Sequence, residues 1–121
     1  MRAIVRPSAS LAELRQKQSE AIVARYASAK GSVLLVGDMN EGPDGNAIQT
    51  FEVAGFRRSC SSPRQQCSTF PGPTYFLPAV LEIDHILGRN VEFEEARVIR
   101  EGGSDHFPVF AKLRLSKRRT E

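Results

Sequence analysis

A run of four apolar residues, Val33-Leu34-Leu35-Val36, constrains the fold most, because glycines at positions 31 and 37 bound it on both sides. Aliphatic and β-branched residues without polar alternation are typical of a strand that is buried on both faces. The run therefore predicts a fully buried strand early in the chain. A polar loop follows it directly.

Helices are predicted before and after this strand. Ser10 and Glu13 fit the capping-box pattern S-x-x-E, and Gly31 is suited to the position after a helix end. We therefore expect one amphipathic helix over residues 11–30. A second, shorter helix is predicted to run from residue 46 or 47 to residue 54.

The rest of the chain is predicted to hold short strands and loops. Residues 107–115 alternate between apolar and polar side chains, which indicates a strand with one buried face. Residues 60–80 are rich in Ser, Pro, Gly and Gln and are predicted to be mostly loop. Further strand segments are predicted at 1–6, 56–59, 82–87, 91–93 and 96–99, with a turn at 88–90.

Length and composition fit a single small domain. The chain has 121 residues, of which 40% are hydrophobic, and a chain of this size buries roughly two-thirds of its unfolded surface. No apolar run approaches the ~20 residues of a membrane span, and no signal peptide is visible, so the location is taken as cytoplasmic by default. The net charge of +3 suits phosphate-bearing partners, but taken alone it is more typical of an ordinary solvated surface.

The two cysteines allow two interpretations. Cys60 and Cys67 are separated by seven positions, and the two histidines do not lie at zinc-finger spacing, which argues against a structural zinc site. Either the pair forms a loop-closing disulfide in an oxidising environment, or both remain ordinary thiols.

Three polar clusters lie at the ends of apolar strands, where loops are exposed but firmly anchored. One follows the first strand at 37–40, one lies within a strand at 83–87, and one precedes the last strand at 104–109. Asp84 is the most informative, because aspartate is disfavoured in strands and a buried carboxylate needs a partner. His85 points to the opposite face of an extended strand, which leaves His106 as the expected partner.

These groups form a chemically coherent set. A carboxylate that is bonded to an imidazole fixes its tautomer and favours its protonated form. Asp38 and Asp105 add hard oxygen ligands for Mg²⁺ or Mn²⁺, and Asn40 adds an amide that can bind a phosphate oxygen or a water. These are the components of metal-assisted phosphoester hydrolysis.

The motifs G-D-M-N at 37–40, I-D-H-I-L at 83–87 and S-D-H-F-P-V at 104–109 occur in this order. Together they resemble the carboxy-terminal half of the endonuclease/exonuclease/phosphatase family, which includes deoxyribonucleases, abasic-site endonucleases and sphingomyelinases. T-F-P at 69–71 and R-Q-K-Q at 15–18 resemble further family segments. The resemblance covers about residues 10–115.

The resemblance implies a role for each matched residue. Asp38 would position or activate the attacking water or serve the metal, Asn40 would hold the phosphate or the nucleophile, and Asp84 would orient His106. His106 would contact the scissile phosphate, and Asp105 would contribute to metal binding. Which group acts as general base is left open. Three arginines are added as candidate substrate contacts: Arg57, Arg58 and Arg64.

The implied fold is the carboxy-terminal half of a four-layer α-β-β-α sandwich, in which residues 1–121 form a single partial domain and 116–121 a disordered tail. The amino-terminal half of that family carries the glutamate that is the main metal ligand. We therefore expect a phosphoesterase acting on nucleic acid, phospholipid head groups or sugar phosphates, with doubtful activity in this chain alone. Two alternatives stay open: a short form completed by dimerisation, and a non-catalytic half-domain that binds phosphate or nucleic acid.

Overall fold

The computed structural model describes residues 7–26, 28–61, 67–75 and 78–115, without the side chains of residues 7–10. Two helices and five strands make up most of this part of the chain, joined by one short 3₁₀ turn. In sequence order they are α1 (Pro7–Tyr26), β1 (Val33–Asp38), α2 (Asn46–Val53), β2 (Arg57–Arg58), η1 (Pro73–Tyr75), β3 (Asp84–Arg89), β4 (Val91–Val98) and β5 (Val109–Leu115).

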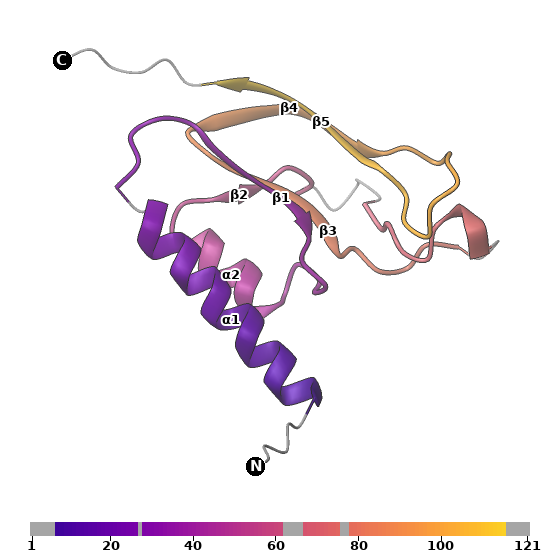
Figure 1. Ribbon diagram of the computed structural model, residues 1–121. Helices are drawn as coiled ribbons and strands as arrows, with labels where there is room; N and C mark the ends of the chain where they lie inside the picture. Colours follow the sequence, from indigo (N-terminus) through magenta and orange to yellow (C-terminus); the bar gives the residue numbers. More distant parts are fainter. Residues whose placement is uncertain (1–6, 27, 62–66, 76–77, 116–121) are drawn as a thin grey trace.

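The elements form three layers (Figure 1). The helices cover one face of an antiparallel sheet with strand order β1-β3-β2, and the antiparallel pair β4-β5 lies on the other side of that sheet. Asn90 has a φ of 58° and turns the chain from β3 directly into β4. The described residues thus form an α+β arrangement of two helices and antiparallel sheets, as predicted.

Two apolar clusters hold the layers together. The first lies between the helices and the sheet and contains Ile48, Phe51, Phe56 and Leu87, all nearly inaccessible to solvent. Each such side chain contributes about 1.5–3 kcal/mol when it is fully buried. The second cluster joins the sheet to β4 and β5 and is built from Cys60, Cys67, Ala96 and Val98.

Helix α1 begins and ends four residues earlier than predicted. The S-x-x-E pattern was misleading because Pro7, whose fixed φ suits the first position of a helix, starts the helix before Ser10. At the other end, Arg89 donates hydrogen bonds to the carbonyl oxygens of Tyr26 and Ala29, at 2.8 and 2.7 Å. These bonds satisfy carbonyl groups at the helix end, where a glycine was expected to terminate it.

The prediction that β1 is buried on both faces is wrong. Val33 and Leu35 face the helices and pack against the first cluster. Leu34 and Val36 point to the opposite face and are 43% and 67% exposed. These two apolar side chains are exposed because strands β4 and β5 cover only part of that face. Gly88 is the register partner of Leu34, and a Cβ at Gly88 would meet the side chains of Val91 and Phe93 in β4. The start of β4 therefore covers the part of the sheet near Leu34.

The remaining predictions hold with shifts at their ends. Helix α2 spans Asn46–Val53, and residues 57–58 and 109–115 are strands. The turn predicted at 88–90 is confined to Asn90, and the two short strands predicted at 91–93 and 96–99 are one strand with a bulge between Phe93 and Glu95. The strand end expected in residues 1–6 and the tail at 116–121 lie outside the described residues.

Candidate functional site

Antiparallel pairing brings two of the predicted site residues to one end of the sheet. Asp38 is the last residue of β1, Asp84 is the first residue of β3, and the two are direct partners in the strand register. Because directly paired residues project to the same face, both carboxylates lie on the face opposite the helices. Asp38 is half exposed, whereas the side chain of Asp84 is 19% exposed.

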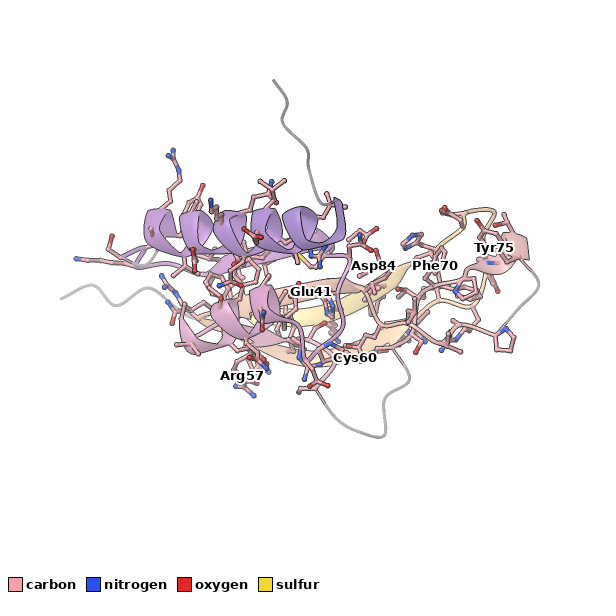
Figure 2. The ribbon with its side chains drawn as sticks, turned by 90° about the horizontal axis from the view of Figure 1, so that it is seen from below. Glu41, Arg57, Cys60, Phe70, Tyr75 and Asp84 are labelled. Atoms are coloured by element: carbon pink, nitrogen blue, oxygen red, sulfur yellow. A yellow bond between two sulfur atoms is a disulfide. The ribbon has the colours of Figure 1, made fainter. Side chains whose placement is uncertain are left out.

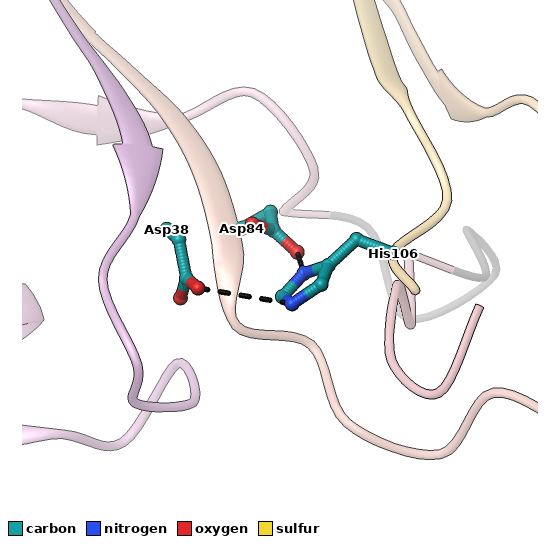
Figure 3. Close-up of side chains that lie close together, drawn as sticks. All are labelled: Asp38, Asp84 and His106. Carbon is teal, nitrogen blue, oxygen red and sulfur yellow. Dashed lines mark hydrogen bonds and ion pairs between the residues drawn. The ribbon is translucent and has the colours of Figure 1, made fainter. Parts of the chain in front are cut away.

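His106 reaches this pair from the loop that precedes β5 (Figure 3). Its Nδ1 lies 2.7 Å from Oδ2 of Asp84, and its Nε2 lies 3.8 Å from Oδ2 of Asp38. The imidazole thus stands between two carboxylates, bonded to one and facing the other. The predicted partnership of Asp84 with His106 is confirmed.

Residues 68–72, which we call the cradle, hold the loop of His106 in place. Thr69 is completely buried, and its hydroxyl donates to the same Asp84 oxygen that binds His106. The ring of Phe70 lies beside the His106 ring, with centroids 5.0 Å apart. The Thr69 carbonyl accepts a hydrogen bond from the N–H of Phe107 at 2.8 Å. The T-F-P motif marked this segment, but no role was assigned to Thr69 or Phe70.

The hydrogen bond to Asp84 raises the pKa of His106 above its ordinary value. Partial burial opposes this shift, whereas the negative charges of Asp84, Asp38 and Asp105 support it. A raised pKa favours the imidazolium, in which Nδ1–H donates to Asp84 and Nε2–H points toward Asp38. When protonated, the ring therefore presents a cationic donor next to a solvent-accessible carboxylate.

The loop after β1 is fixed by Glu41, which the sequence analysis did not single out. The Glu41 carboxylate accepts a hydrogen bond from the N–H of Ile48 at 2.9 Å and pairs with Arg15 at 3.2 Å. Its carbonyl oxygen lies 2.8 Å from Nε2 of the buried His85, which gives His85 a structural contact. The glutamate thereby ties the loop that carries Asp38 to both helices and to β3. Within that loop, the N–H of Asn40 donates to Asp38 Oδ1 at 2.9 Å.

The structure brings some predicted residues together and leaves others apart. Asn40 is exposed two residues beyond Asp38, and its φ of 54° marks the turn there. Asp105 lies on the His106 loop, where its carboxylate accepts a hydrogen bond from the Ser104 hydroxyl at 3.2 Å. It does not belong to the group of potential metal ligands found among the described residues, which is Asp38, Asp84 and His106.

The arginines do not join this group. Arg57 is exposed on β2 and stands apart from Asp84 in Figure 2. Arg58 pairs with Glu52 and Glu82, each at 3.4 Å, so its charge is already matched by two carboxylates. Burial raises the pKa of Glu82, although Arg58 and His85 oppose that shift. Arg64 lies outside the described residues.

The donor set fits a divalent cation in part. Ligand atoms of Asp38, Asp84 and His106 lie within 4.8 Å of one another. Oδ2 of Asp84 is already shared by Thr69 and His106, whereas the Asp38 carboxylate is half exposed. Hard oxygen ligands of this kind suit Mg²⁺ or Mn²⁺, so Asp38 is the residue of this set best suited to hold such an ion.

Comparison with known proteins identifies the fold. No family model matches the chain, and no curated protein matches it. An endonuclease/exonuclease/phosphatase protein of Bacteroides vulgatus superposes with a TM-score of 0.72 at 20% identity, over 86% of this chain and 45% of its own length. The chain has the fold of one half of an endonuclease/exonuclease/phosphatase protein.

Two further structures share this half of the endonuclease/exonuclease/phosphatase fold. A conserved protein of unknown function from Enterococcus faecalis superposes with a TM-score of 0.75 at 24% identity, over 85% of this chain and 45% of that one. A mannosyl-6-phosphatase of Bacteroides thetaiotaomicron superposes with a TM-score of 0.66 at 18% identity, over 89% and 47%. The chain thus spans about half the length of these structures, the extent expected for the carboxy-terminal half.

Within the described residues, no helix has the length and apolar character needed to cross a bilayer.

Proposed function

We propose that this chain contributes four residues, Asp38, Asn40, Asp84 and His106, to the active site of a phosphoester hydrolase that depends on Mg²⁺ or Mn²⁺. The observation that carries the proposal is the placement of His106 between Asp84 at 2.7 Å and Asp38 at 3.8 Å. The half-domain fold shared with endonuclease/exonuclease/phosphatase proteins supports the same reaction class. A fold alone does not assign a reaction, so the proposed reaction rests on the side chains of the site.

In this proposal His106 binds the phosphate. Its raised pKa favours the cationic ring, and Asp84 holds Nδ1–H, so that Nε2–H can donate to a phosphoryl oxygen. The negative charge on the phosphoryl oxygens grows as the attacking oxygen adds, and a fixed imidazolium stabilises that charge without reorganising. Asn40, exposed beside Asp38, supplies an amide donor to the same phosphate.

Asp38 acts on the nucleophile. Its half-exposed carboxylate faces Nε2 of His106, and a water between it and a bound phosphorus atom would be oriented for attack. Asp38 accepts the proton of that water as the new P–O bond forms. The bond to the leaving oxygen breaks, and this oxygen departs with the electron pair and takes up a proton from solvent. A divalent cation bound through Asp38 would neutralise phosphate charge. Asp105, on the neighbouring loop, is proposed as a further oxygen ligand.

We further propose that a second polypeptide segment of similar size completes this site. The face that carries Asp38 also carries the exposed apolar side chains Leu34 and Val36. Exposed apolar surface of this kind is typical of a face that another layer covers. The solved structures with this fold are about twice as long as the matched region. A longer polypeptide or a second copy of the chain are the two candidate sources.

The first test is hydrolysis of bis(p-nitrophenyl) phosphate, an activated phosphodiester, with Mg²⁺ by the complete protein. His106→Ala and Asp38→Ala should each reduce kcat by about 10²–10⁴-fold, the usual contribution of such groups. Asp44→Ala is the matched control, because Asp44 is an exposed carboxylate on the same loop. Unchanged turnover in either site variant would contradict the proposal.

The substrate class is tested by a turnover screen with nucleic acid, phospholipid head groups and sugar phosphates. Saturable binding of these ligands without any turnover would instead favour the non-catalytic half-domain. The phosphate-binding role of His106 and Asn40 would survive that result, whereas the role of Asp38 toward water would not.

A further inference from the structure

A disulfide joins the sheet to the cradle. Cys60 lies two residues beyond β2 and is linked to Cys67, which immediately precedes residues 68–72, with their Cα atoms 6.4 Å apart. Both cysteines are buried, at 9% and 4% exposure, and pack against Ala96 and Val98 of β4. The covalent link therefore runs through the apolar layer between the sheet and the β4-β5 pair. Figure 2 labels Cys60 together with Asp84 and Phe70.

The cradle holds His106 on both sides in the sequence. The N–H of Phe107 donates to the Thr69 carbonyl at 2.8 Å, and the N–H of Gly72 donates to the Asp105 carbonyl at 2.6 Å. The Thr69 hydroxyl also binds the Asp84 oxygen that receives His106 Nδ1. Any displacement of the cradle would therefore move both partners of the Asp84–His106 pair.

Outside the His106 loop, the cradle is anchored by the Leu81 bridge, by the disulfide and by Arg100, which donates to the Ser68 carbonyl at 3.1 Å. On one side, the N–H of Thr69 donates to the Leu81 carbonyl at 2.8 Å, within a β-bridge between Phe70 and Leu81. On the other side, the anchor is the disulfide, and the Cys60 end of it is firmly held. The N–H of Ser59 donates to the carbonyl of Ile86 in β3, and Arg58 donates to the Cys60 carbonyl at 3.0 Å.

We propose that the Cys60–Cys67 disulfide is a redox-sensitive positioning element, whose reduction loosens the cradle and disorders the Asp84–His106 pair. The cross-link ties Cys67 to the firmly held Cys60 and so lowers the conformational entropy of any state in which the cradle is loose. Without it, the cradle is held by non-covalent contacts such as the Leu81 bridge and the hydrogen bond from Arg100 to the Ser68 carbonyl. The effect on turnover rests on the proposed function, whereas the effect on geometry does not.

The chemistry requires an external dithiol. One thiolate of the dithiol attacks a protein sulfur, and the other protein sulfur leaves as a thiolate and takes up a proton. The second thiol of the reagent then resolves the mixed disulfide, so that Cys60 and Cys67 gain two electrons and two protons in total. The dithiol leaves as its own disulfide.

The test is amide hydrogen exchange by NMR on the 121-residue chain, oxidised and after reduction with dithiothreitol. The amides of Thr69 and Phe107 report the cradle, and the amide of Met39, which donates to the Ile83 carbonyl, reports the sheet. Reduction should speed exchange at the two cradle amides by about tenfold or more while the Met39 amide changes less than about twofold, as expected for local opening. The double variant Cys60→Ser/Cys67→Ser should exchange like the reduced protein and should not respond to dithiothreitol.

Two results would overturn the proposal. Unchanged exchange at Thr69 and Phe107 in the double variant would show that the disulfide does not hold the cradle. Equal acceleration at Met39 would show that the disulfide stabilises the whole fold and has no local effect on the site. Neither readout uses enzyme activity, so failure of the proposed hydrolase function leaves this test intact.

Discussion

Nδ1 of His106 and Oδ2 of Asp84 lie 2.7 Å apart, although the two residues belong to a loop and a strand 22 positions apart in the sequence. The Thr69 hydroxyl binds the same oxygen, so the carboxylate accepts two donors at once. A carboxylate held in this way fixes the ring orientation and the tautomer of the histidine.

Asp84→Asn should lower the pKa of His106 relative to the wild-type protein. The amide keeps the shape of the side chain but removes the anionic acceptor that holds the imidazolium. NMR titration of the His106 ring protons measures the change, and the chain has only one other histidine to resolve. In the complete protein we expect a loss in kcat of about 10²-fold or more. An unchanged His106 titration would contradict the role given to this bond.

The free energy of unfolding should fall as pH rises through the raised pKa of folded His106. The folded state binds the His106 proton more tightly than the unfolded state does, so the stabilisation is complete below the ordinary histidine pKa of about 6.5. Urea denaturation at a series of pH values measures this dependence. His106→Gln should flatten the curve in that window, and stability that rises there in the wild-type protein would be the opposite outcome.

Gly72→Ala should destabilise the folded protein, because Gly72 packs against the loop that carries His106. A Cβ at position 72 would lie 2.5 Å from backbone atoms of Asp105 and His106. Only a shift of the backbone could relieve this clash, because no flexible side chain is involved. We expect a loss of about 1–3 kcal/mol in the free energy of unfolding, as for other overpacked positions. Gly103→Ala is the matched control, because a Cβ there meets nothing within 4 Å. Chemical denaturation of both variants checks the difference, and equal stabilities would count against the close approach.

Val36→Lys should leave the isolated chain nearly as stable as before, within about 0.5 kcal/mol, because this side chain is 67% exposed. Leu87→Ala, at a fully buried position in the adjacent strand, should cost about 2–5 kcal/mol. The lysine should also weaken any association that covers the apolar face, which light scattering measures for the chain alone and with a completing segment. Association that is insensitive to Val36→Lys would place the partner elsewhere.

The isolated chain should bind Mn²⁺ weakly and show negligible turnover, because it contributes only part of the proposed ligand set. Asp38→Asn should weaken Mn²⁺ binding by about tenfold or more, while Asp44→Asn should not. Calorimetry or water-proton relaxation measures the binding. In the complete protein, chelation with EDTA should abolish hydrolysis, and turnover that persists without metal would contradict the proposed cation dependence.

Much of the site was predictable because strand ends carry clear chemical signals. Asp84 within an apolar strand required a partner, strand geometry excluded His85, and His106 was the remaining histidine. Asp38 lies at the same site because β1 and β3 pair in register. The family resemblance implied a shared site for these residues, but not this pairing. The predicted roles of these residues await the experiments above.

Tertiary contacts account for what the sequence could not predict. The end of α1 depends on Arg89, which lies 63 and 60 positions away from Tyr26 and Ala29, whose carbonyls it binds. The exposure of Val36 depends on how far β4 and β5 extend over the sheet, which no local pattern reports. The pairing of Cys60 with Cys67 likewise depended on the fold, since their spacing allowed either state.

The contacts of Glu41 have a consequence for how proteins with this half-domain can diverge. Its side chain reaches α1 and α2 while its backbone binds His85, and the space for its carboxylate exists only because position 45 lacks a Cβ. Inserting or deleting a residue between Asp38 and Gly45 would break these contacts together. The length of this loop is therefore expected to be invariant among descendants of the chain, so that new substrate preferences have to arise from insertions in other connections.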